Sequence, residues 1–361
     1  MMIKNDYHPN YVFPPGETLK DTLQTIGMTQ AELAKRMDRP LTNINKIIKG
    51  KKAIESETAL QLERVLGISA SFWSNMERQY REFLARQKET KKLSKDLSWL
   101  KKIPVTNMIK QGWITRCENS IDQLKEVLNY FGIVSPKQWD SWWKSRHFTT
   151  EFKTSKYFKY DNFAMAAWLR KGELEAQKIQ CSKFDEEKFR QAICKIRKLT
   201  IIRDPKQFWP KLVDICKQAG VAVVLVPEIP KTHTGGAVRW LKNKALMQLS
   251  LRYKTNDHFW FNFFHETGHI LLHNKKNFFI EEVTKDDYET QADNFAANFL
   301  IPNNEFTKFR KLKIFNKLSI KEFAEKINIH SGIVVGRLQH NKDLGPNVYN
   351  DLKVRYERTR R

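Results

Sequence analysis

This sequence has few cysteines, no long apolar run and fewer acidic than basic residues. The longest aliphatic run, Val221–Val226, is far too short to cross a bilayer. Residues 1–11 are polar and lack the apolar core of a signal peptide. The four cysteines form no Cys-x-x-Cys pair, which fits a reducing compartment, and they lie far apart at Cys117, Cys181, Cys194 and Cys216. We therefore expect a cytoplasmic protein with no membrane partner.

The charge balance is strongly basic. The 361 residues include 64 Lys and Arg against 40 Asp and Glu, which gives a formal net charge of +24 and an isoelectric point near 9.8. Such a surplus suits a polyanionic partner, because each phosphate contact releases condensed counterions. A surface of solvated lysines explains the same balance equally well. Charge alone therefore assigns no partner.

The pattern of apolar residues changes along the chain. Up to about residue 202 they recur at steps of three and four, as in helices, with a lysine-rich stretch over 87–102. After Pro205, predicted helices alternate with strand-like segments at Val221–Val226, Ala237–Trp240 and Leu246–Leu251. A long helix is expected from about residue 255 to 273 and another over Tyr288–Phe299. A mostly helical α+β fold follows.

The segment His265-Glu266-Thr267-Gly268-His269 fits the pattern H-E-x-x-H. Residues four apart lie on one face of a helix, so both imidazoles can reach one metal ion. Zinc lowers the pKa of a bound water towards about 7, and the carboxylate of Glu266 can then take its proton. Five residues alone are a weak signal, and a third ligand is needed.

The next predicted helix supplies a candidate for that ligand. Glu289 lies twenty residues after His269, which leaves room for a loop and a return. Asp293, one turn further, can accept the free N–H of a ligand histidine. The alternative is that both carboxylates belong to an ordinary solvated helix face.

Other histidines compete for these roles. His273 lies four residues after His269 and is a rival third ligand, although we interpret it as a residue of the helix end. The metzincin pattern is excluded because Leu272 and Lys275 occupy the positions of its glycine and third histidine. His258 and His233 flank the motif as groups that can steady a tetrahedral intermediate, or as plain surface residues.

These residues resemble a known family, the ImmA/IrrE metallopeptidases, over about Val221–Pro302. The resemblance is carried by Phe264–His273, Glu289–Ala297 and Leu300–Pro302. It implies a gluzincin-like site in which His265, His269 and Glu289 bind Zn²⁺ and Glu266 is the general base. It also implies that the substrate is a transcriptional repressor, in stress response or mobile-element control.

A substrate of such a site lies extended along a sheet edge. Gly235, Gly236 and Ala237 are candidates for that edge, because glycines allow close approach of another backbone. A plain β-turn is the equally weighted alternative.

The N-terminal region has the pattern of a helix-turn-helix. Thr29 is a predicted N-cap with Glu32 completing a capping box, and a second helix covers Leu41–Lys49 before Gly50. Amides, hydroxyls and a lysine on the exposed face of that helix suit reading of the DNA major groove. The candidate contacts are Gln30, Thr42, Asn43, Asn45, Lys46 and Lys49. A helical protein-binding module is the alternative.

This region is similar to the HigA-type antitoxins of the Xre group over about His8–Leu84. The similarity is carried by Thr29-Gln30 with Leu33-Ala34, by Ile47–Ile54 and by Phe72-Trp73. It implies a homodimer that binds double-stranded operator DNA and regulates its own operon, with or without a toxin partner. Near the other end, Ser319–Ile327 repeats the apolar spacing of the N-terminal pair without its amide-rich face. We expect it to pack on the preceding domain, and a second DNA contact is the alternative.

The predicted organisation has four parts. They are a helix-turn-helix domain (1–87), a helical connecting domain (88–204), a peptidase domain (205–304), and a C-terminal helical region with a basic tail (305–361). The chain is then a DNA-binding zinc metalloendopeptidase that cleaves a transcriptional regulator. The alternative is an antitoxin-like repressor whose zinc domain senses a partner without turnover. A merely structural zinc site has no need of Glu266, which favours the enzyme.

Overall fold

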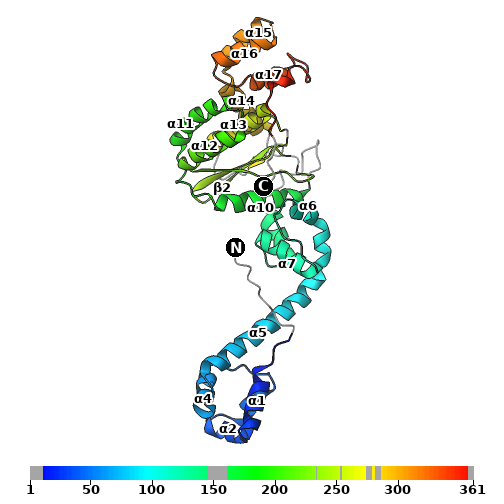
Figure 1. Ribbon diagram of the computed structural model, residues 1–361, viewed down its shortest axis with the longest axis vertical. Helices are drawn as coiled ribbons and strands as arrows, with labels where there is room; N and C mark the ends of the chain where they lie inside the picture. The colour runs from blue at the N-terminus through cyan, green and yellow to red at the C-terminus, as the bar shows by residue number, and fades with distance from the viewer. Residues whose placement is uncertain are drawn as a thin grey trace. The chain divides into compact units, whose positions relative to one another are not determined.

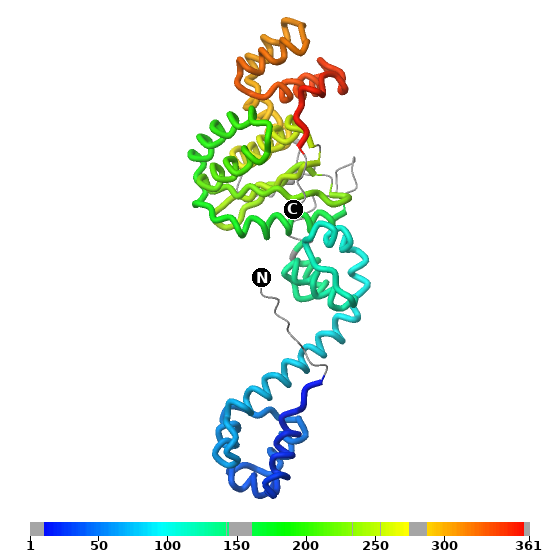
Figure 2. The backbone as a smooth tube through the Cα atoms, in the orientation of Figure 1, coloured from blue at the N-terminus to red at the C-terminus, as the bar shows by residue number. Residues whose placement is uncertain are grey.

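The computed structural model describes residues 11–144, 161–232, 234–252, 254–273, 279–280 and 286–356. Two compact units divide the chain, Met1–Asp96 and Leu97–Arg361, and Figures 1 and 2 draw both. The expected mostly helical α+β fold is confirmed. Within the described residues, no helix is both long and apolar enough to cross a membrane.

The described part of the first unit is helical. Its helices are α1 (Pro15–Thr25), α2 (Gln30–Arg36), α3 (Leu41–Ile48), α4 (Ser56–Leu66) and α5 (Ala70–Leu93). They enclose one apolar core that includes Leu19, Leu33, Ile44 and Trp73. Gly16 lets α1 approach the end of α3, because a Cβ there would lie 2.3 Å from the carbonyl oxygen of Ile47.

The second unit begins with helical segments and continues into a small sheet. Its helices before the sheet are α6 (Val105–Lys110), α7 (Ser120–Phe131), α8 (Pro136–Trp139), α10 (Asn162–Gln177), α11 (Glu186–Lys198) and α12 (Pro205–Gln218). Shorter helical turns cover Ser94–Lys102, Asp140–Lys144, Leu199–Ile201 and Asn350–Leu352. The strands are β1 (Val221–Leu225), β2 (Gly236–Leu241), β3 (Lys244–Leu249) and β4 (Phe279–Ile280). The later helices are α13 (Asn256–Leu272), α14 (Asp286–Leu300), α15 (Asn303–Lys311), α16 (Lys317–Lys326) and α17 (Ser331–His340).

The sheet has the strand order β1-β3-β2-β4. β1 runs parallel to β3, with Val221 opposite Ala245, while β2 is antiparallel to both β3 and β4. Helix α10 covers one face of the sheet, and α11, α12 and α13 cover the other (Figure 1). Both faces are therefore buried, which explains why β1 and β3 consist largely of consecutive apolar residues.

Polar side chains of the sheet fasten α10 to it. The Gln248 amide donates to the Trp168 carbonyl oxygen over 2.7 Å, and the Trp168 indole donates to the Val226 carbonyl oxygen over 3.1 Å. The Lys244 ammonium donates to two carbonyl oxygens at the end of α10, those of Ala176 and Ile179, at 2.7 Å each. Helix α10, which the sequence assigned to a connecting domain, is thus an integral layer of the second unit.

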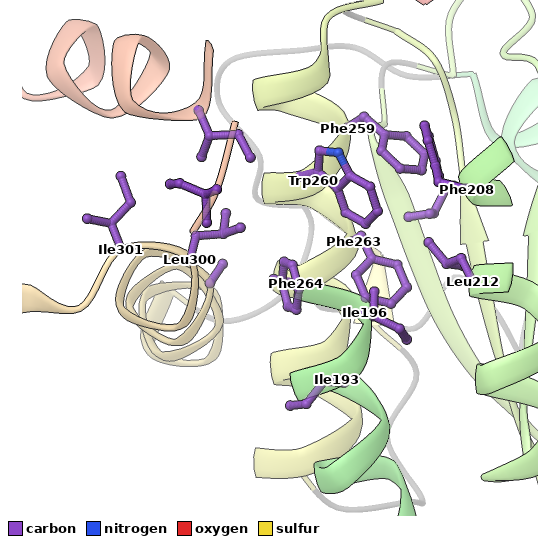
Figure 3. Close-up of a cluster of buried hydrophobic side chains, with 14 of the residues drawn as sticks. Ile193, Ile196, Phe208, Leu212, Phe259, Trp260, Phe263, Phe264, Leu300 and Ile301 are labelled. Carbon is purple, nitrogen blue, oxygen red and sulfur yellow. The ribbon is translucent and has the colours of Figure 1, made fainter. Parts of the chain in front are cut away.

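The main core lies between the sheet and α13. Phe259, Trp260 and Phe263 project from α13 towards Phe208 of α12, and Leu300 lies beyond the opposite side of α13 (Figure 3). Helix α13 is apolar nearly all round and is buried along almost its whole length. The polar motif residues on it are therefore held inside the protein.

The C-terminal helices belong to the same core. Ile320 of α16 and Val334 and Leu338 of α17 are fully buried within it, as the apolar spacing of Ser319–Ile327 predicted. Helix α17 packs directly on α13. The structure therefore shows this helix pair packed against the sheet-bearing part of the chain.

Arg197 of α11 joins three distant backbone segments. Its guanidinium donates to the carbonyl oxygens of Phe299 at 2.9 Å, Leu300 at 2.8 Å and Ile327 at 2.9 Å. These carbonyls include the last ones of α14, which have no partner within their own helix. One side chain thus caps α14 and fixes the segment that follows α16.

We expect Arg197→Met to lower the free energy of unfolding of the second unit by roughly 2–4 kcal/mol, because buried carbonyls lose a charged donor. Urea unfolding followed by tryptophan fluorescence measures this. The fluorescence reports mainly on the second unit, because Trp73 is the only tryptophan before Leu97. The control is Arg190→Met on the same helix, whose exposed pair with Glu186 is worth within about 0.5 kcal/mol. Equal losses in the two variants would contradict the prediction.

Candidate metal centre and nucleic-acid interface

His265 and His269 lie one turn apart on α13, with ring centroids separated by 4.7 Å. Both side chains are almost fully buried. Helix α14 packs along α13 and brings Glu289 to the same place. The structure thus joins the three predicted ligands in one cluster, in which one donor atom from each lies within 4.8 Å of the others.

The donor atoms of this cluster form a compact triangle. Nε2 of His265 is 3.0 Å from Nε2 of His269 and 3.1 Å from Oε2 of Glu289, and Nε2 of His269 is 3.4 Å from Oε1 of Glu289. Bonds of 2.0–2.2 Å to a tetrahedral zinc ion separate its ligand atoms by about 3.3 Å. Two imidazoles and one carboxylate at these separations fit a zinc ion.

The other ring nitrogen of each histidine also has a partner. Nδ1 of His265 lies 2.8 Å from Oδ1 of Asp293, and Nδ1 of His269 lies 3.0 Å from Nδ1 of His273. A partner at Nδ1 fixes the tautomer and turns the Nε2 lone pair towards a metal. His273 therefore faces the far nitrogen of His269, and its atoms are not part of the donor cluster.

The electrostatics favour the metal-binding forms of these groups. Burial lowers the pKa of His269 and of His273, so both imidazoles are neutral at neutral pH. Burial alone would raise the pKa of Glu289, but hydrogen bonds from His265 and His269 outweigh it and lower the pKa to about 2. Neutral imidazoles and an ionised carboxylate are the forms that bind zinc.

Glu266 lies between α13 and the start of β2. Its side chain is fully buried. Gly236 makes room for it, because a Cβ on that residue would lie 2.2 Å from Oε1 of Glu266. Glycine at position 236 thus serves the close approach of the strand to this carboxylate, a role that the sequence analysis did not assign to it.

The predicted substrate edge is only partly available. Gly236 pairs with Leu249 of β3, and Ala237 pairs with β3 on one side and with Ile280 of β4 on the other. Ala237 therefore does not lie at a free edge, because the two-residue strand β4 covers it. Gly235 and Gly236 precede the part of β2 that β4 pairs with, and their role at an edge stays a prediction.

Two further histidines flank the motif in the sequence. His258 lies on α13 two turns before His265 and lines a cavity between α13, α14 and α17. His233 lies outside the described residues.

In the first unit, α2 and α3 form the predicted helix pair. The side chain of Thr29 accepts a hydrogen bond from the backbone N–H of Glu32 over 3.1 Å, as an N-cap does, while the Glu32 carboxylate pairs with Arg36. Ile44 and Ile47 of α3 are buried. Its other face leaves Thr42, Lys46 and Lys49 exposed and Asn43 and Asn45 half-buried, and Gln30 at the start of α2 is half-buried too.

Comparison with known families fits both sites. The IrrE N-terminal-like domain, a peptidase family, matches residues 217–338, and the helix-turn-helix family matches residues 19–73. The chain joins an IrrE-like peptidase domain to a helix-turn-helix domain. The family resemblance seen in the sequence is thereby confirmed, and the match to the IrrE-like domain continues through most of α17.

Individual relatives match the chain over a shorter length. Virulence-associated protein I of Dichelobacter nodosus is 35% identical over 74 residues, which are 20% of this chain and 68% of that protein. A HigA-family addiction module antidote protein from Coxiella burnetii is 32% identical, with a TM-score of 0.22, and the match covers 23% of this chain and 91% of that one. An antidote protein of a plasmid maintenance system from Nostoc punctiforme is 23% identical over 23% of this chain and 92% of its own, with a TM-score of 0.23.

We expect Glu289→Ala to remove most of the zinc from the IrrE-like domain, because two neutral imidazoles alone leave the site without its anionic ligand. Metal analysis of the purified protein should give about one zinc ion per chain in the wild type. The control, Asp287→Ala, removes an exposed carboxylate from the same helix and should keep the metal. Equal zinc content in wild type and Glu289→Ala would exclude Glu289 as a ligand.

Proposed function

We propose that this protein is a zinc-dependent metalloendopeptidase whose substrate is a transcriptional regulator. One observation carries the proposal: the three donor atoms of His265, His269 and Glu289 form a triangle of zinc-site dimensions on the helix that also bears the buried Glu266. The resemblance of these residues to the ImmA/IrrE peptidases supports both the metal and the class of substrate.

The residues of the chain divide the work of peptide hydrolysis. A zinc ion held by His265, His269 and Glu289 would supply Lewis acidity, which would polarise a peptide carbonyl and lower the pKa of a water towards about 7. The carboxylate of Glu266 takes the proton of the attacking water and then delivers it to the leaving amine. Asp293 and His273 hold the two histidine rings in place through Nδ1. The dry surroundings of Glu266 strengthen these electrostatic effects.

We expect cells that produce Glu266→Gln to lack a regulator fragment that appears with the wild type, because an amide cannot accept the proton of water. Proteomic detection of new N-termini under several stresses measures this. Gly236→Ala should reduce the same fragment while the protein keeps its zinc, since the three heavy atoms nearest to the added Cβ all belong to Glu266. Identical peptide profiles for the wild type and Glu266→Gln would favour a sensor without turnover.

The proposal extends to operator DNA as a second partner. In the helix-turn-helix domain, α3 exposes Thr42, Lys46 and Lys49 while its isoleucines fill the core, and such a face suits the major groove. A homodimer would read two half-sites and regulate the operon of this protein, and the family resemblance allows a toxin as a further partner. DNA and a transcriptional regulator as partners place the protein in the cytoplasm.

We expect Asn45→Ala to weaken binding to the DNA upstream of its own gene by about tenfold or more, because a side-chain amide on a base edge is worth roughly 1–3 kcal/mol. The affinity should also fall steeply with salt. The logarithm of the binding constant should fall linearly with the logarithm of the salt concentration, with a slope of about −0.9 for each phosphate contact. Fluorescence anisotropy over a range of salt concentrations measures both. The control Gln87→Ala removes an exposed amide from α5. Binding that salt does not change would contradict the proposed interface.

A further inference from the structure

A cavity of about 220 Å³ lies between α13, α14 and α17. Its walls are largely apolar and include Phe261 of α13, Leu300 of α14 and Ile333 of α17. Nothing in the proposed zinc chemistry uses this cavity.

The cavity lies beside the metal centre. Phe261 precedes His265 by one turn of α13, and the centroids of their rings are 6.3 Å apart. On α14, Ala297 lines the cavity one turn after Asp293, whose carboxylate contacts His265. Leu300, which lines the cavity, lies on the side of α13 away from Phe208 (Figure 3). Two residues of the cavity wall, Phe261 and Ala297, therefore lie one helical turn from residues of the metal centre.

Among the described residues, the cavity is lined by one arginine, Arg337, that forms no ion pair with a carboxylate. Oδ2 of Asp257 pairs with the Lys353 ammonium at 2.7 Å, and both side chains are nearly buried. Arg337 lines the cavity from α17, and its Nε is buried without a hydrogen-bond partner among the described residues. Its guanidinium lies over the ring of Phe306, 5.5 Å from the centroid. A buried guanidinium nitrogen without an acceptor is costly unless a ligand supplies one.

The surroundings of Arg337 agree with that account. Burial lowers the pKa of Arg337, nearby Arg310 lowers it further, and the carboxylate of Asp293 opposes both. Oδ1 of Asp257 is also buried without a hydrogen-bond partner among the described residues, and a backbone N–H of a bound peptide is a suitable donor for it.

We propose that this cavity is a substrate subsite that accepts an acidic side chain of the peptide, with Arg337 as its anchor. A carboxylate can receive two parallel N–H bonds from a guanidinium, and the apolar walls cover the methylene groups of an aspartate or glutamate. The proposal rests on the proposed peptidase function and names the substrate class that this site selects: peptides with an acidic residue at one fixed position beside the cleaved bond.

The proposal also gives the C-terminal helices a function. Gly336 lets α17 approach α13 closely, because a Cβ there would lie 2.5 Å from Oδ2 of Asp257. Without α17 the cavity would lose the wall that carries Arg337. Helix α17 therefore contributes to substrate selection as well as to the core.

The experiment exposes the zinc-loaded, full-length protein to a synthetic peptide library with randomised central positions, and mass spectrometry identifies the cleaved bonds. The wild type should prefer Asp and Glu over Asn and Gln at one position by about tenfold or more, as expected for a charge-assisted hydrogen bond. Arg337→Glu should abolish this preference and favour Lys there, and Arg337→Lys should keep part of it. The control Arg310→Gln changes a neighbouring arginine that does not line the cavity.

A second measurement separates the subsite from turnover. The same library is passed over immobilised, zinc-loaded Glu266→Gln protein, with and without Arg337→Gln, and the retained peptides are sequenced. Cleavage without an acidic preference, or with one that Arg337→Glu leaves unchanged, overturns the subsite and keeps the peptidase. If acidic peptides are retained in a way that depends on Arg337, but no peptide is cleaved, the subsite is supported and the proposed peptidase function is contradicted. If the peptides are neither cleaved nor selectively retained, the subsite is overturned. Equal zinc content in all variants confirms that they are folded.

Discussion

The close packing of α13 against α14 creates the metal centre, and the rest of the second unit supports it. A Cβ on Gly268 would lie 3.0 Å from Cα of Ala292, so both crossing positions must be small. Gly268 precedes His269, and Ala292 lies between Glu289 and Asp293. The crossing thereby brings the ligand carboxylate and the carboxylate on Nδ1 to the two histidines at once. A larger side chain at position 268 would push α13 and α14 apart. The donor atoms of the metal centre would then no longer lie 3.0–3.4 Å from one another.

Helix α13 must in turn be anchored at its own start, because its histidines keep their positions only if the helix does. The C-terminal segment provides this anchor. The N–H of Asn256 donates to the Val354 carbonyl oxygen over 2.9 Å, and the N–H of Tyr356 donates to the Lys254 carbonyl oxygen over 2.7 Å. The buried Asp257–Lys353 pair adds a charged contact at 2.7 Å. Residues far along the chain thus fix the helix on which the chemistry depends.

The sequence predicted the local features of the site well, since they follow from spacing within one helix. His265 and His269 face the same way because they are four residues apart, and Glu289 could be predicted because it lies twenty residues after His269 on the next predicted helix. Contacts between side chains and between different elements were harder to predict from the sequence. The contact of His273 with the far nitrogen of His269 had a signal in its spacing of four, but that spacing fits a metal ligand equally well.

Three features had no signal that sequence reasoning could use. The attachment of α10 to the sheet depends on Gln248 and Trp168, which are 80 residues apart. The pairing of β4 with Ala237 comes from two residues in a stretch too short to show alternation. The cavity beside the metal centre joins Phe261 and Arg337, whose proximity only the packing of α17 on α13 reveals.

The environment of Glu266 connects catalysis with the sheet. A glutamate on a helix exposed to water would have many rotamers, and its carboxylate would be solvated. Burial against β2 restricts the rotamers and excludes water. Gly236 is the position at which a larger residue of the strand would collide with the carboxylate. β2 is held by β3 on one side and by β4 on the other. The sheet therefore fixes the direction in which Glu266 points, as α14 fixes the two histidines, and the proposed reaction needs both constraints together.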